Sequence, residues 1–184
     1  MNKKAQVWVE TVIYTLIGLG IMAAILTAIT PKIKQMNDKA TIEQTINLMN
    51  DLNKKINAVQ VAQGNVREFN IRIKKGELII DPSTESISYV MPETNLLFSE
   101  PGVPVKYSDI NITTTESNKK TYEINLSLNY NPSIIQLTYD LNEDKKILSQ
   151  SPIEYKILIS NEGLKDDDSD PGTPEKININ LKQA

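Results

Sequence analysis

The stretch from Thr11 to Thr30 contains twenty residues and no charged side chain. This is about the length that an α-helix needs to cross the hydrocarbon core of a bilayer. Backbone polar groups in lipid must be satisfied within the segment, so a helix is the state expected for it. These residues therefore do not belong to the core of a water-soluble domain, and we expect residues 11–30 to form a membrane-length helix.

The charges around this stretch suggest a function for it. Lys3 and Lys4 precede it, and Glu10 places a carboxylate at its edge, where an acidic side chain is costly unless it has a task. Three uses remain open at this point: a discarded signal, a plain anchor and a polymerisation element. The sequence Ala28-Ile29-Thr30-Pro31 lacks the small residues of a conventional cleavage site, so we expect the helix to stay with the protein.

Small residues recur every four positions along this helix, at Gly20, Ala24 and Ala28. Such a stripe allows close approach of a neighbouring helix backbone. Glycine and alanine are also common in membrane helices that do not associate. Together with the carboxylate of Glu10, the stripe favours a self-associating helix.

Residues 31–64 continue the helical pattern with a polar face. Pro31 predicts a kink near the end of the apolar run, and Gly64-Asn65 predicts the end of the helix. We expect the apolar face to pack on the chain's own head and on neighbouring copies. The stripe that defines this face has spacings of three and four and comprises Ile42, Ile46, Met49, Leu52, Ile56 and Val59.

Residues 65–184 change to the two-residue alternation of β-strands, with frequent turn signals. Many short strands predict an antiparallel sandwich or curled sheet, so the fold class is α+β, with a long helix carrying a β-sandwich-like head. The expected strands are 69–74, 78–80, 86–91, 96–98, 110–112, 122–130, 134–141, 153–160 and 177–181.

The composition excludes several functional classes. The chain has neither cysteine nor histidine, which removes disulfides, thiolate chemistry, histidine-ligated metals and a Ser-His-Asp triad. The net charge of -3 provides no basic field for nucleic acid. The remaining acidic residues show no spacing typical of an acid/base pair. We therefore expect no enzyme activity, no cofactor and no nucleic-acid partner.

Two weaker signals lie in the head. Asn111-Ile112-Thr113 and Asn125-Leu126-Ser127 are N-glycosylation sequons, on the polar phase of their expected strands. In the acidic loop, Asp166, Asp168 and Asp170 alternate as calcium ligands do, but a proline and an isoleucine occupy the places of the usual glycine and glutamate. We expect this loop to be solvated and keep calcium as the alternative.

The N-terminus resembles the class III signal peptide of archaeal type IV pilin-like proteins. Lys3-Lys4-Ala5-Gln6, Glu10 and the intact helix carry the resemblance, although Ala5 stands where the family often has glycine. The resemblance implies removal of residues 1–5 by a prepilin peptidase, between Ala5 and Gln6. The head has no family motif, so the resemblance is specific only over roughly the first thirty residues.

The resemblance also implies the architecture and the partners. Residues 6–64 would form the helix and residues 65–184 the extracellular head, with the N-terminus cytoplasmic before assembly. The subunit would sit in the membrane, meet the pilus assembly machinery and then polymerise with itself into an archaeal surface filament used for adhesion. A non-polymerised anchored binding module, a minor pilin and an archaellum-type subunit are the alternatives.

Glu10 takes a specific role under this resemblance. Cleavage would create an ammonium group at Gln6, four residues before Glu10 on the same helix. A carboxylate in an apolar bundle is tolerated when it is paired or neutralised. We expect Glu10 to pair with the Gln6 amine of its own or a neighbouring subunit and to set the register of assembly.

Overall fold

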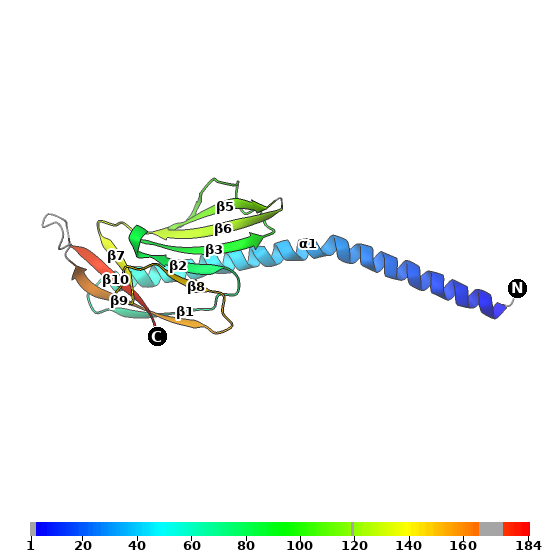
Figure 1. The fold of residues 1–184 in the computed structure, drawn as a ribbon, viewed down its shortest axis with the longest axis horizontal. Coiled ribbons are helices and arrows are strands. Elements are labelled where there is room, and N and C mark those ends of the chain that lie inside the picture. Colours follow the sequence, from blue (N-terminus) through cyan, green and yellow to red (C-terminus); the bar gives the residue numbers. More distant parts are fainter. Residues whose placement is uncertain (1–2, 119, 166–174) are drawn as a thin grey trace.

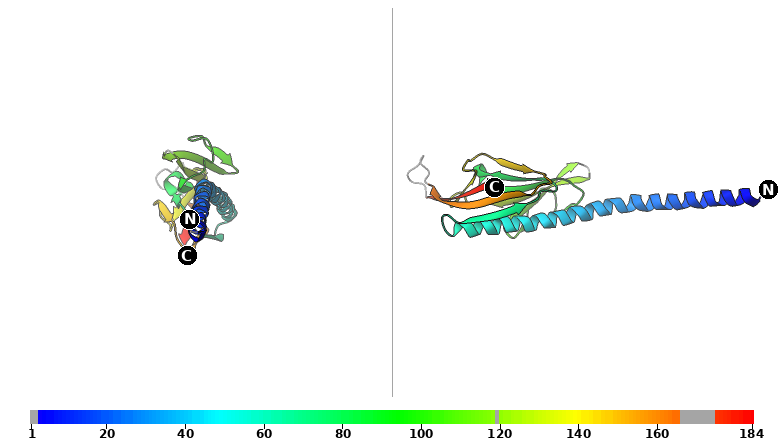
Figure 2. Two further views of the ribbon diagram at one scale, coloured as in Figure 1. Left: turned by 90° about the vertical axis from the view of Figure 1, so that its right-hand side faces the viewer. Right: turned by 90° about the horizontal axis from the view of Figure 1, so that it is seen from below.

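The computed structural model describes residues 3–118, 120–165 and 175–184. Its fold is α+β: one long helix is followed by a head with two β-sheets (Figure 1). Helix α1 (Lys3–Gln60) has 58 residues, about 87 Å at 1.5 Å per residue. Its N-terminal half extends away from the head and its C-terminal half lies along it (Figure 2). The other elements are β1 (Val66–Ile71), β2 (Glu77–Asp81), the 3-10 helix η1 (Pro82–Thr84), β3 (Ser86–Thr94), β4 (Val105–Tyr107), β5 (Ile110–Asn118), β6 (Thr121–Asn129), β7 (Ile135–Tyr139), β8 (Lys146–Ser149), β9 (Tyr155–Lys165) and β10 (Lys176–Gln183).

The predicted apolar stripe of the helix is confirmed as part of the core. All six of its side chains, from Ile42 to Val59, are at most 6% exposed and belong to one cluster with residues of both sheets. Asp38 is the first buried residue of α1, so the head begins to cover the helix there.

The helix ends at Gln60, four residues before the predicted stop at Gly64. It continues through Pro31, and the ribbon bends where it leaves the head (Figure 1).

The first sheet has the strand order β1-β9-β10-β7 and the second β4-β5-β6-β3-β2-β8. The prediction of a purely antiparallel head was wrong at one pair, because β10 runs parallel to β7, with Ile177 opposite Ile135. A parallel pair needs a long crossover connection. Here the chain leaves β7 for β8 in the second sheet and returns through β9 before β10 is inserted.

Apart from shifts at the strand ends, such as β1 ending at Ile71 and not at residue 74, the expected strands differ from the structure in three places. Residues 96–98 form no strand; Leu96 and Phe98 pack against the core from an irregular segment. Strands β4 and β8 were not predicted, because β4 is exposed throughout and β8 buries only Leu148. Both missed strands are short sheet edges that bury at most one side chain each, so neither produces a regular apolar alternation in the sequence.

Candidate assembly surface

The free half of α1 presents an apolar surface that no described part of the chain covers. From Val7 to Ile29 its large apolar side chains are between 37% and 72% exposed. Among the described residues, α1 is the one helix long and apolar enough to cross a membrane. An apolar surface of this length in water is unfavourable and marks contact with lipid or with other protein. The predicted membrane-length apolar helix over residues 11–30 therefore agrees with the structure.

Threonine hydroxyls inside this half are satisfied by the helix itself. Thr11, Thr15, Thr27 and Thr30 each donate a hydrogen bond to the carbonyl four residues earlier, at 2.6–2.9 Å. A hydroxyl in lipid or in a dry bundle without a partner would be costly. These bonds leave the helix compatible with an apolar environment. These threonines were not predicted as functional residues, although their place in an apolar helix was the available signal.

The small-residue stripe lies open along the same half. Gly20, Ala24 and Ala28 are exposed, and a Cβ atom built on Gly20 would meet nothing within 4 Å. The stripe therefore makes no helix contact within the described chain. A close helix neighbour would have to come from another molecule.

The predicted processing and pairing residues lie at the start of the helix. Ala5 and Gln6 are within α1, and their side chains lie outside the described set. Glu10 is exposed and lies about one helical turn after Gln6, because a turn contains 3.6 residues. The cleavage between Ala5 and Gln6 and the pairing of Glu10 with a new amine remain predictions.

The junction between helix and head is held by a polar network centred on Asp38. Its carboxylate accepts hydrogen bonds from Lys75 Nζ (2.8 Å) and from the backbone N–H and side-chain Nδ2 of Asn95 (2.7 and 3.0 Å). Lys75 Nζ also donates to the Glu93 carbonyl, and Tyr89 Oη donates to the Lys75 carbonyl. Burial by itself would raise the pKa of Asp38. The bonds from Lys75 and Asn95 and the lysine charge outweigh it, so this pKa lies below its ordinary value.

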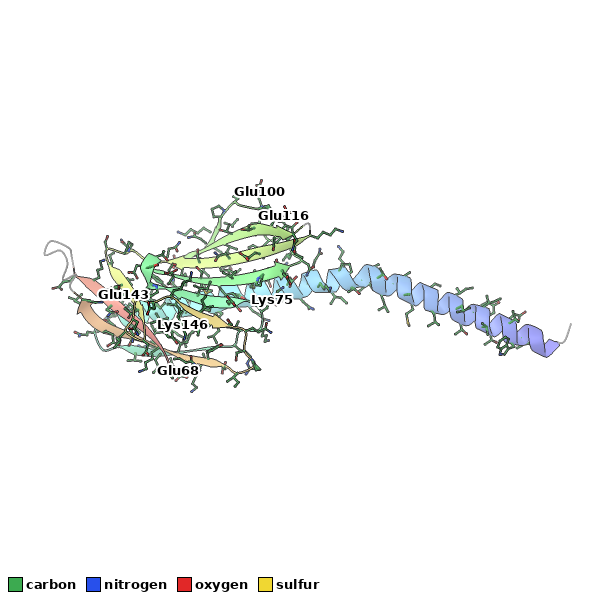
Figure 3. The ribbon with its side chains drawn as sticks, viewed as in Figure 1. Glu68, Lys75, Glu100, Glu116, Glu143 and Lys146 are labelled. Carbon is green, nitrogen blue, oxygen red and sulfur yellow. The ribbon has the colours of Figure 1, made fainter. Side chains whose placement is uncertain are left out.

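The network fixes two loops of the head on the helix. Lys75 lies between β1 and β2, and Asn95 directly follows β3. Figure 3 places Lys75 at the end of the head nearest the free half of α1, whereas Glu143 lies toward the opposite end. The role of Asp38 was not predicted from the sequence, because its partners lie 37 and 57 residues away along the chain.

The two sequons come together on neighbouring strands. Asn111 lies opposite Ser127 and Thr113 opposite Asn125 in the β5–β6 register, so all four share the outward face. Both asparagines are half-buried, and Asn125 Oδ1 is buried without a hydrogen-bond partner. Whether either asparagine carries a glycan remains a prediction.

A polar cavity of about 300 Å³ lies where the β4–β5 turn and the end of β6 meet the helix. Asn53 donates to Asp109 Oδ2 (3.0 Å) and accepts from Tyr130 Oη (3.2 Å) beside it. Burial and the nearby Asp109 carboxylate raise the pKa of Tyr130, so its hydroxyl stays protonated. Asn57, Asn111, Asn129 and Asn131 also line the cavity.

The acidic loop with Asp166, Asp168 and Asp170 lies outside the described residues, so its calcium alternative remains a prediction. Within the described ranges, no group of three or more acidic side chains is arranged to hold a metal ion.

Comparison with known proteins gives no relative from which a function can be transferred. No protein-family model matches the chain, and neither the curated proteins nor the solved structures contain a significant match.

Proposed function

We propose that this protein is a structural subunit of an archaeal type IV pilus-like surface filament. The helix would polymerise into the filament core, and the head would be exposed for attachment to surfaces. The observation that carries the proposal is the division of α1 into two halves. One half is buried in the chain's own head, and the other presents a membrane-length apolar surface with an open small-residue stripe.

This division suits a subunit that moves from a membrane to a filament. Lipid covers the apolar half before assembly, and neighbouring helices cover it afterwards. The head keeps its own core in both states, since every core side chain of the helix lies beyond Asp38. Removal of residues 1–5 would place a new ammonium at Gln6, one turn from the Glu10 carboxylate.

The experiment is expression of the full chain together with an archaeal prepilin peptidase and assembly machinery. We expect surface filaments whose subunits begin at Gln6 by intact mass. Glu10→Ala should be processed normally but should lower filament yield at least tenfold, because the new ammonium at Gln6 loses its carboxylate partner. The matched control is Glu43→Ala, which removes an exposed carboxylate paired with Lys39 at 3.9 Å. Wild-type filament yield from Glu10→Ala would refute the pairing role.

A second candidate is a binding module on a single-pass anchor that never polymerises. The cavity beside Asn53 favours it, because a polar, amide-lined hollow is suited to a hydroxyl-rich ligand. An uncleaved Met1 in monomeric membrane fractions, with no filaments, would select this candidate. A minor pilin would instead be cleaved between Ala5 and Gln6 and found in filaments made mainly of another chain. An archaellum-type subunit would be cleaved at the same place and found in a filament attached to a rotary motor.

A further inference from the structure

We propose that the end of the head facing the free helix docks onto anionic lipid headgroups while the subunit is still in the membrane. This inference rests on the membrane-inserted stage of the proposed function. It adds a lipid preference and a defined head position to that stage. Three observations carry it: the level of the head above the apolar run, two cavities at that level, and the charges that line them.

The geometry of α1 brings this end of the head to the headgroup layer. The uncharged run ends at Thr30, and the first buried helix residue, Asp38, follows eight positions later, about 12 Å further along the axis. The polar layer on each side of a bilayer is about 5–7 Å thick. A head that starts at Asp38 therefore stands just above that layer, and any loop reaching further toward the N-terminus enters it.

The β5–β6 hairpin is such a loop. A cavity of about 480 Å³ is lined by the helix from Thr27 to Gln35, by Asn95 after β3 and by Lys120 at the hairpin turn. Lys120 thus lies level with the end of the apolar run. Figure 1 shows the end of β5 and the start of β6 directed toward the free half of α1.

The lining of this cavity matches a phosphate group. Lys34 and Lys120 contribute two ammonium groups and Gln35 an amide donor, whereas the amide of Asn95 already donates to Asp38. The lining contains no carboxylate among the described residues. Neither Lys34 nor Lys120 forms an ion pair within the described part of the chain. The ammonium groups are therefore available to a lipid phosphate.

A second cavity at the same end repeats this chemistry. It measures about 580 Å³ and is lined by Arg72 and Lys74 with residues 150–152, again without a carboxylate among the described residues. The two loops that form it are joined by the hydrogen bond from Ser151 N to the Ile73 carbonyl (3.0 Å). Its place beside Lys75 puts it at the level of the Asp38 network.

The other charged side chains at this end do not line either cavity. Lys39 and Lys75 are engaged by Glu43 and Asp38. The acidic side chains Glu93, Glu116 and Glu154 are exposed, but none lines either cavity. Lys and Arg side chains near an anionic membrane surface bind it favourably, within the roughly 8–10 Å range of screened charges.

The test measures how close the hairpin lies to the lipid. The chain has no cysteine, so Ser117→Cys gives a single fluorophore site on β5 near the hairpin turn. The labelled full chain is reconstituted into vesicles of phosphatidylcholine alone or of phosphatidylcholine with phosphatidylglycerol, each containing a quencher attached to lipid headgroups. We expect stronger quenching with phosphatidylglycerol, lost at high salt. Lys34→Gln/Lys120→Gln should reduce the ratio of docked to undocked heads on the order of tenfold.

The matched control is Lys54→Gln/Lys106→Gln. It removes the same charge from two exposed lysines. Lys54 lies about 30 Å further along the helix axis, at 1.5 Å per residue from position 34, and Lys106 lines the cavity beside Asn53. Its quenching should equal that of the unsubstituted protein. Equal quenching in both kinds of vesicle, or equal loss in both double variants, would overturn lipid docking. Loss of quenching on adding inorganic phosphate at constant ionic strength would also overturn it, because it would assign the cavity to free phosphate.

Failure of this inference is distinguishable from failure of the proposed function. Carbonate extraction of the same vesicles reports insertion of the helix independently of the fluorophore, because an inserted chain stays in the membrane fraction. An inserted chain without lipid-dependent quenching overturns only the docking inference. A chain that does not insert overturns both proposals.

Discussion

Asp38 shows how one side chain determines the relation between the helix and the head. It lies at the boundary where α1 changes from exposed to buried, and its side chain is only 10% exposed. Its carboxylate gathers an ammonium group and two amide donors from two separate loops. A buried carboxylate without such partners would be strongly unfavourable. The network therefore favours one orientation of the head on the helix over others.

We predict that Asp38→Asn lowers the free energy of unfolding by about 1–3 kcal/mol at neutral pH, because Lys75 loses its counter-charge in a partly buried site. The lowered pKa of Asp38 sets the pH dependence. Its contribution is fully present above the unfolded pKa of about 4 and is lost as the pH falls through the lower folded pKa. The difference between the two proteins should therefore shrink toward zero in acid.

Chemical unfolding of the full chain in detergent, followed by circular dichroism between neutral and acidic pH, measures this difference. Burial raises the pKa of Glu85, which has the opposite pH dependence, but both proteins retain Glu85 and its effect cancels. The control is Asp51→Asn, an exposed carboxylate paired with Lys55 at 3.9 Å, for which we expect a change below about 0.5 kcal/mol. Equal effects of the two substitutions would contradict a special role for Asp38.

At the scale of elements, the turn between β1 and β2 depends on a close backbone approach. Gly76 has φ +87°, and a Cβ atom added there would collide with the Val90 carbonyl oxygen on β3. We predict that Gly76→Ala costs about 2–4 kcal/mol, from the left-handed backbone and the displacement of β3. Gly102→Ala is the control: its φ is +78°, but the added Cβ would meet nothing within 4 Å, so about 1 kcal/mol is expected. Thermal unfolding that gave equal losses would show that the collision is relieved cheaply.

The hairpin of β5 and β6 places a limit on glycosylation. Asn111 and Asn125 are diagonal neighbours in the register, and such positions are about 7–8 Å apart. Two glycans rooted that close on one face would clash. We predict that each chain carries a glycan on at most one of the two asparagines. Glycopeptide mass spectrometry of native protein, digested so that residues 111–125 stay on one peptide, tests this; a peptide with both sites occupied would contradict it.

The elements also show where sequence reasoning ends. The helix core from Ile42 to Val59 and most strands were predictable, because their burial produces a regular apolar period in the sequence. The parallel pairing of β10 with β7 was not, because it depends on which sheet the intervening β8 joins. Edge strand β4 and the Asp38 network left no local signal, since one lacks burial and the other depends on distant partners. The pairing of the two sequons likewise required the register.

For the whole molecule, the two halves of α1 separate folding from assembly. The half beyond Asp38 supplies apolar side chains to the same cluster as both sheets, so altering it should unfold the head. The half before Thr30 contributes none of the core side chains, so altering it should leave the head folded. Substitutions in the apolar half are therefore suited to testing self-association alone.

We predict that Ala24→Ile reduces filament yield at least tenfold, because the added side chain prevents the close helix approach that the stripe allows. The control is Met22→Ile, which places the same isoleucine side chain off the stripe, at a position that is 61% exposed. Both variants should insert into membranes and unfold like the unsubstituted protein in detergent, since neither position contributes to the core. Filament yield is measured by shearing and electron microscopy. Equal yields from Ala24→Ile and Met22→Ile would show that the stripe is not an assembly contact. A loss confined to Ala24→Ile would place the helix–helix contact of the filament on the face of Gly20, Ala24 and Ala28.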